Sequence, residues 1–215
     1  SVLHHALGLS YERMARIMRA TLLGGIVAFA LAFAPPADAQ PTAEELAAGR
    51  QLFAEALDDE EHKRFAVALE KYNRVLKLKD TAAIRYRLGA TYEGLGKITQ
   101  AVDSYAAALR LATTPGPDAK PDPGLAKASQ ARIDALEPRV ARLSLKVRPP
   151  ANGATPEVQV DEAPVPLEQT GDLRIDPGPH VVTATAEGSQ PFRAEVSLSE
   201  GGRAELPVVF EPLPP

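Results

Sequence analysis

The chain has 215 residues, 45% of them hydrophobic, which is enough for one large domain or two small ones. Its 20 prolines and its aromatic content of only 5% favour small modules divided by loops over one large enzyme core. The net charge of −4 provides no basic field for a nucleic-acid partner, and the absence of cysteine excludes disulfides, thiolate metal sites and a cysteine nucleophile.

The first segment has the pattern of an export signal. Arg13, Arg16 and Arg19 precede the uncharged run ATLLGGIVAFALAFA at residues 20–34. A helix of this length would span roughly 22 Å, which is less than the roughly 30 Å of bilayer hydrocarbon. The small-x-small sequence that ends at Ala39 predicts cleavage there. We therefore expect residues 1–39 to be a signal peptide with an upstream extension, and the protein to be exported to the periplasm or cell envelope.

An uncleaved anchor is the alternative for this segment, and it would be the only membrane contact of the chain. The first residue is Ser1 rather than a methionine, and Met14 or Met18 would each begin a signal of ordinary length.

Residues 42–111 contain no proline, and their apolar residues recur at helical spacing. The stretch RFAVALEKYNRVLKL (64–78) aligns with ITQAVDSYAAALRLA (98–112), so that Ala68, Tyr72 and Val75 match Ala101, Tyr105 and Ala108 at a spacing of 33 residues. A period near 34 with two helices per unit indicates a helical solenoid. A further helix over about 124–137 is expected to cover the end of the stack, after the loop TTPGPDAKPDP.

The second unit resembles a tetratricopeptide repeat, and the resemblance implies such a domain over residues 40–140. We expect Gly89 to let two helices approach closely and Gly96 to close the first helix in a left-handed conformation. The first unit has Ala56 in place of Gly89 but Asp59 at the Tyr92 position. The matching positions are Leu88, Gly89, Tyr92, Gly96, Ala101, Tyr105 and Ala108.

The usual role that this resemblance implies is the binding of a protein or peptide in a concave groove formed by the first helices of the units. A spacer or self-association element is the alternative. The candidate groove side chains are Arg50, Glu55, Arg85 and Glu93.

After Pro138 the pattern changes to period two, beginning with Leu143, Leu145 and Val147. Further strands are expected at 157–161, 172–176, 180–187, 192–198 and 203–210, divided by proline and glycine clusters. This predicts a small antiparallel β-sandwich over 141–211 with a tail at 212–215. The fold class is therefore α+β in separate modules, with tetratricopeptide-like helical hairpins first.

The β part resembles the PEGA domain of bacterial and archaeal envelope proteins. The resemblance rests on VQVDEAPVPL, IDPGPHVVTATAEG and FRAEVSLSEGGRAELPVVF, with Pro177, Gly178 and Gly188 as turn residues. Glu162 stands where the family has a turn glycine. The resemblance implies an extracytoplasmic binding or structural module without catalytic residues.

The sequence contains no Walker-type, GxSxG or HExxH pattern, which are the motifs of nucleotide binding, serine hydrolases and zinc proteases. His62 and His180 lie in different modules, so we expect no metal site, and we interpret His180 as a turn residue bonded to backbone. The acidic stretch at 58–64 is interpreted as a solvated helix end and loop rather than a cation site. We expect no cofactor and no enzyme activity, although a spatial carboxylate pair would leave no local signature.

These observations predict an exported, non-catalytic scaffold that binds partner proteins through its helices and is positioned in the envelope by its β domain. The alternative is a cell-wall or surface-polysaccharide binder acting through the β domain. Residues 143–215 contain only two aromatic residues, Phe192 and Phe210, both expected to be buried, which disfavours a sugar platform. The same residues hold 11 acidic against 5 basic side chains, which disfavours phosphate ligands there.

Overall fold

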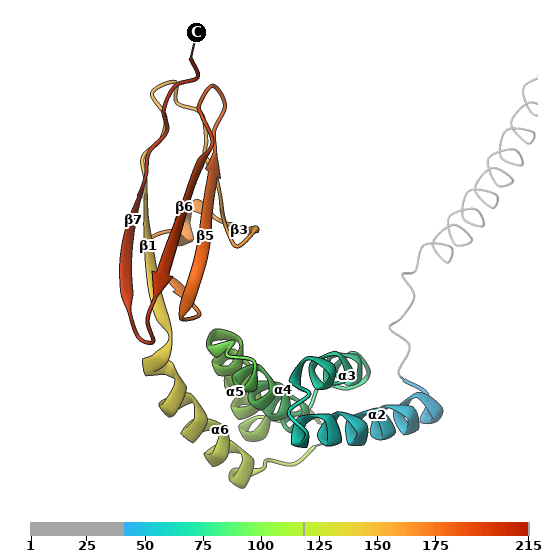
Figure 1. Ribbon diagram of the computed structural model, residues 1–215. Coiled ribbons are helices and arrows are strands. Elements are labelled where there is room, and N and C mark those ends of the chain that lie inside the picture. The colour runs from blue at the N-terminus through green and yellow to red at the C-terminus, as the bar shows by residue number, and fades with distance from the viewer. Residues whose placement is uncertain (1–40, 118, 215) are drawn as a thin grey trace, which may run out of the picture. The chain divides into compact units, whose positions relative to one another are not determined.

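The computed structural model describes residues 41–117 and 119–214. The expected export signal and its cleavage after Ala39 lie outside these residues. Five packed helices form an N-terminal module, and two small sheets form a β module after it, so α+β in separate modules is confirmed (Figure 1). Within the two described ranges, no helix is both long enough and apolar enough to cross a membrane.

The N-terminal module consists of helices joined by short connections. They are α2 (Ala43–Glu61), α3 (Phe65–Leu78), α4 (Ala82–Gly94), α5 (Ile98–Thr113) and α6 (Pro123–Leu136). The side chains of Thr81 and Asp122 cap the N-termini of α4 and α6 by accepting from the N–H groups of Ile84 and Leu125. Gly96 has a φ of 72° just after α4, so the predicted left-handed closure of that helix is confirmed.

The interior of the helical module consists of the residues that recur in the sequence. The two tyrosines, Tyr72 and Tyr105, are at most 1% exposed, and each packs between the helices of its own unit. A Cβ atom on Gly89 would lie 2.8 Å from the Tyr105 ring, so the expected close approach at this glycine is confirmed. The other buried members of the repeat are Ala68, Val75, Ala101 and Ala108.

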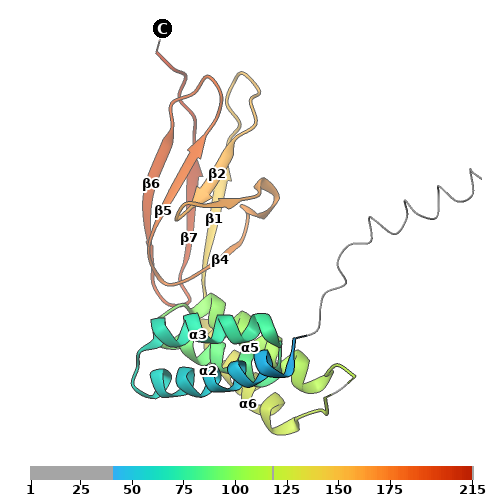
Figure 2. The ribbon, with the colours of Figure 1, turned by 90° about the vertical axis from the view of Figure 1, so that its right-hand side faces the viewer.

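The β module contains two sheets (Figure 2). The two sheets share one hydrophobic core. The strands are β1 (Ala141–Val147), β2 (Glu157–Val160), β3 (Ala163–Val165), β4 (Leu173–Ile175), β5 (Gly178–Thr185), β6 (Phe192–Leu198) and β7 (Arg203–Val208). One sheet has the order β4-β1-β7 and the other β3-β2-β5-β6. Alternate residues of both sheets, including Leu143, Val182 and Val208, point into the core and are fully buried.

Two features of the β module differ from the prediction. Not every pair is antiparallel, because β7 lies parallel to β1, with Leu143 opposite Ala204. An alternating pattern fixes which face of a strand is buried, but it carries no information about the direction of the neighbouring strand. The strand β3 was also missed, since Pro164 argues against a strand; its edge position tolerates the missing N–H.

The backbone has positive φ angles, which favour glycine, at three of the expected turns. Gly178 has a φ of 130° and Gly188 a φ of 72°. Between β2 and β3, Asp161 and Glu162 have φ values of 49° and 67°, the pattern of a type I′ hairpin turn. Glu162 therefore takes a conformation that glycine adopts without strain.

The turn between β4 and β5 also reaches the helices. Oδ1 of Asp176 accepts from the backbone N–H of Thr99, 2.8 Å away, and from the Thr99 hydroxyl. This carboxylate satisfies an N–H at the start of α5, where Lys97 provides no side-chain cap. Next to it, Arg174 forms ion pairs with Asp103 and Glu137.

Candidate functional site

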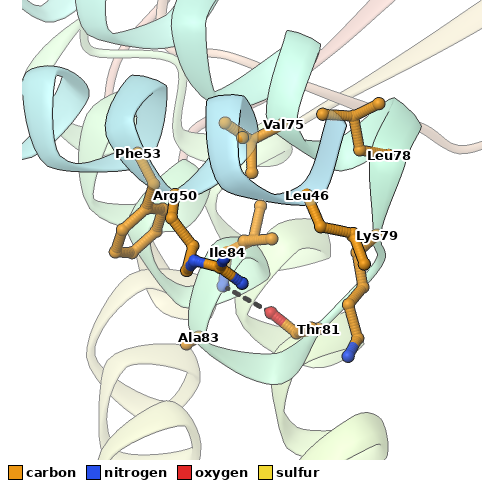
Figure 3. Close-up of a pocket in the computed structure, with 10 residues that line it drawn as sticks. Leu46, Arg50, Phe53, Val75, Leu78, Lys79, Thr81, Ala83 and Ile84 are labelled. Atoms are coloured by element: carbon orange, nitrogen blue, oxygen red, sulfur yellow. Dashed lines mark hydrogen bonds between the residues drawn. The ribbon is translucent and has the colours of Figure 1, made fainter. Parts of the chain in front are cut away.

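A cavity of about 470 Å³ opens between α2, the end of α3 and the start of α4 (Figure 3). Its volume lies within the range of small ligand or side-chain pockets. Its walls are mainly apolar. They are formed by Leu46, Gly49 and Phe53 of α2, Val75 and Leu78 of α3, and Ala83 and Ile84 of α4, with Arg50, Lys79 and Thr81 as the polar lining.

Two local features shape the walls of this cavity. Gly49 lies against the side chain of Leu78, and a Cβ on Gly49 would come within 2.9 Å of it, so α2 and α3 are close at one side of the cavity. Thr81 caps α4 by accepting from the N–H of Ile84, and this cap turns the chain into α4 along the cavity (Figure 3). The first helix of each unit therefore contributes a wall.

Two cations belong to this cavity, Arg50 on α2 and Lys79 just after α3. Both are exposed, and among the described residues neither side chain forms a hydrogen bond or ion pair with another group. In Figure 3 Arg50 points from α2 toward Thr81. An apolar wall beside two unpaired cations suits an apolar segment that carries a carboxylate, since the carboxylate can reach the cations while the rest is buried.

The other groove candidates lie elsewhere. Glu55 is paired with Lys71 at 3.3 Å and lines a neighbouring groove of about 440 Å³ between α2 and α3. Arg85 binds Asp80 through two hydrogen bonds of 2.8 and 2.7 Å, and lines a separate depression against α5. Arg50 is therefore the one of the four candidates that lines the cavity.

Glu93, the fourth candidate, is engaged inside the helical module. It accepts from the Tyr105 hydroxyl at 3.3 Å and is paired with Arg132 of α6. Burial, together with the nearby Glu93 charge, raises the pKa of the Tyr105 hydroxyl well above its usual range, so this hydroxyl stays a donor. The side chain of Glu93 thus links α4, α5 and α6 rather than facing a ligand.

The sequence did not point to Phe53, Leu46 or Lys79 as members of the cavity. Phe53 could have been found, because it lies three residues after Arg50 and so shares its helix face. Its ring also packs edge-on against Tyr72, with the centroids 5.6 Å apart. Lys79 follows the end of α3, and no periodicity reaches that position.

The acidic stretch at 58–64 forms the end of α2 and a turn, as predicted, but one of its residues is not solvated. Asp59 is only 5% exposed and is paired with Arg64 at 2.7 Å and Lys71 at 2.8 Å. Hydrogen bonds from Lys71 and then Arg64 lower the pKa of this carboxyl below its usual range, although burial opposes them. Among the residues that the structure describes, no group of three His, Cys, Asp or Glu side chains is arranged to hold a metal ion.

His180 has both ring nitrogens occupied. Its Nε2 donates to the carbonyl oxygen of Asp176 at 2.7 Å, so the predicted bond to backbone is confirmed. Its Nδ1 lies 2.6 Å from the carboxylate of Asp161, a partner that the sequence did not suggest. Burial tends to raise the pKa of Asp161, but hydrogen bonds from His180 and the Val181 N–H outweigh it and leave this pKa below its usual range. The imidazole fixes a turn and leaves no nitrogen free for a substrate.

Comparison with protein-family models and with curated proteins finds no match to this chain. The resemblances to tetratricopeptide repeats and to the PEGA domain therefore rest on the residues and geometry given above.

Proposed function

We propose that this protein is an exported, non-catalytic scaffold whose tetratricopeptide-like helices bind a partner protein, and whose PEGA-like β-sandwich positions it in the cell envelope. The observation that carries the proposal is the cavity between α2, α3 and α4, with its apolar walls and the cations Arg50 and Lys79, which have no partner among the described residues. The repeat of two-helix units and the turn conformations in the β module support the two family assignments.

The chemistry of the cavity specifies the kind of segment that would bind. Apolar side chains of the partner would be buried against residues such as Leu46 and Phe53, and burial of one such side chain contributes about 1.5–3 kcal/mol. A carboxylate beside them would pair with Arg50 or Lys79. We therefore expect a short apolar segment with at least one acidic group.

Selection from a phage-displayed library of random heptapeptides on the immobilised full chain tests this proposal. We expect enrichment of peptides that combine Leu, Ile or Phe with Asp, Glu or a free C-terminal carboxylate. The variant Arg50→Glu should lose these peptides at least tenfold (about 1.4 kcal/mol), because the charge reversal repels the carboxylate. It should remain folded, since Arg50 is exposed and has no partner to lose among the described residues.

The matched control is Arg74→Glu, which reverses an exposed charge on α3 that does not line the cavity. This variant should keep the binding of the parent. Equal loss in both variants, or enrichment of the same peptides by Arg50→Glu, would contradict the assignment of the groove.

A further inference from the structure

The strand β6 forms the one long edge without proline among the four strand edges of the β module. The two sheets end in β3, β6, β4 and β7. The strands β3 and β4 have only three residues each, and β7 contains Pro207, which cannot donate to a partner strand. The strand β6 has seven residues, Phe192–Leu198. In the described part of the chain, its ladder with β5 accounts for its backbone hydrogen bonds.

The direction of its unpaired groups follows from the neighbouring strands. The backbone of Val181 in β5 faces β2, because its carbonyl accepts from the Asp161 N–H at 2.9 Å. The next residue, Val182, therefore faces β6 and its partner there, Ala194. By the same alternation, the N–H and C=O groups of Arg193, Glu195 and Ser197 point outward from the sheet.

The core is also incompletely covered along this strand. In β5 the inward residues Val182 and Ala184 are at most 2% exposed. In β6 the inward residues Phe192, Ala194 and Val196 are only half-buried, although they pack against the same core. A strand added beside β6 would satisfy the outward backbone groups and bury these side chains further.

We propose that a second copy of this chain occupies this edge, with β6 pairing antiparallel to β6 about a two-fold axis at Ala194. In this register Arg193 of each copy lies opposite Glu195 of the other on the exposed face, and Phe192 lies opposite Val196 on the core face. Each Arg193–Glu195 pair also exchanges both backbone hydrogen bonds, since these residues face outward.

Charge complementarity selects this register over its neighbours. A two-fold axis at Glu195 would place the two glutamates opposite each other, and an axis at Arg193 would do the same for the two arginines. A shift by one residue would match the core face of one strand to the solvent face of the other. The register at Ala194 is therefore the one in which both unlike pairs form and both faces match.

The test measures the mass of the purified full chain by analytical ultracentrifugation over a range of concentrations. We expect a reversible dimer that Glu195→Arg weakens about tenfold or more, because it places arginines opposite each other. Exchange of the two charges in Arg193→Glu/Glu195→Arg restores unlike pairs in the same register and should restore the dimer. The matched control, Glu157→Arg on the interior strand β2, reverses an exposed glutamate of the same sheet and should dimerise like the parent.

A second variant, Glu195→Pro, removes an N–H that points outward and leaves the bonds between β5 and β6 intact. It should be a monomer with the circular dichroism spectrum of the parent. A monomeric parent at all concentrations, a dimer that survives Glu195→Pro, or a double exchange that stays monomeric would each overturn the proposal. So would co-purification of a different protein that occupies β6 in place of the second copy.

Discussion

Gly89→Ala should destabilise the protein because α4 and α5 approach closely at this position, whereas the same change in an exposed helix would stabilise it. In an exposed helix, replacing glycine by alanine stabilises by about 1 kcal/mol. At Gly89 the new Cβ would lie 2.8–2.9 Å from three atoms of the Tyr105 ring, well inside ordinary contact. The ring cannot yield easily, because it is 1% exposed and packs edge-on against Tyr86, with the centroids 5.1 Å apart.

The expected cost of Gly89→Ala follows from these two effects. Overpacking of a closed core costs about 1–3 kcal/mol, and the rigid ring favours the upper end. After subtraction of the gain in helix propensity, the net loss should be about 2 kcal/mol. For a folded unit of 150–250 residues this lowers the melting temperature by about 4–8 °C.

Thermal unfolding followed by circular dichroism at 222 nm measures this change. Gly124→Ala is the matched control, because a Cβ there meets only Asp122 Oδ1 at 3.4 Å, and its stability should equal or exceed that of the parent. Replacing Tyr105 by leucine should remove the loss of stability caused by Gly89→Ala, since the ring is gone. Parent-like stability of Gly89→Ala with Tyr105 in place would refute the assigned helix contact.

Two further predictions concern the turn at Glu162 and the buried ion pairs of Asp59. Glu162→Gly should stabilise the protein by about 0.5–1 kcal/mol in urea unfolding, because glycine adopts the left-handed φ of 67° without strain, whereas Glu162→Ala should bring no gain. Asp59→Asn should destabilise the protein at neutral pH, because Lys71 and Arg64 lose their partner. Since the folded pKa of Asp59 lies below its ordinary value of 3.8, the contribution of the carboxylate is complete above about pH 4 and is lost as the pH falls through the folded pKa. The difference between parent and variant, measured by urea unfolding between pH 7 and pH 2, should therefore shrink at acid pH; a constant difference would show that the ion pairs do not stabilise the fold.

The elements of this fold could be predicted because each has a strong internal period. The helical repeat gave the positions of α3 and α5, with Tyr72 and Tyr105 both buried at the predicted spacing. The alternation of apolar and polar residues predicted six of the seven strands. What the period cannot give is the partner of a strand, so the parallel pairing of β7 with β1 and the edge strand at Pro164 were found only in the structure.

The candidate site was less predictable, because it depends on which charges find partners. Arg50, Glu55 and Arg85 are all exposed or half-exposed polar residues on first helices, and the sequence treats them alike. In the structure Glu55 and Arg85 are paired with Lys71 and Asp80, and Arg50 remains unpaired among the described residues beside an apolar wall. Pairing across helices depends on packing geometry, which residue type alone does not specify.

The two buried tyrosines have equivalent hydrogen-bond partners, and one of these equivalences is not visible in the 33-residue spacing of the sequence. Tyr72 donates to Glu60 at 2.7 Å, and Arg87 from the next helix pairs with the same carboxylate. Tyr105 and Glu93 repeat this arrangement 33 residues later, but the arginine now comes from α6 and follows Glu93 by 39 residues rather than 27. The longer loop before α6 accounts for half of the extra length, and the longer α5 and the later position of Arg132 in its helix account for the rest. Sequence spacing therefore hides the equivalence of Arg132 and Arg87. Because α6 makes the same contact as α4, it extends the helical stack by one further helix, and the short turn Glu137–Arg139 then leads into β1.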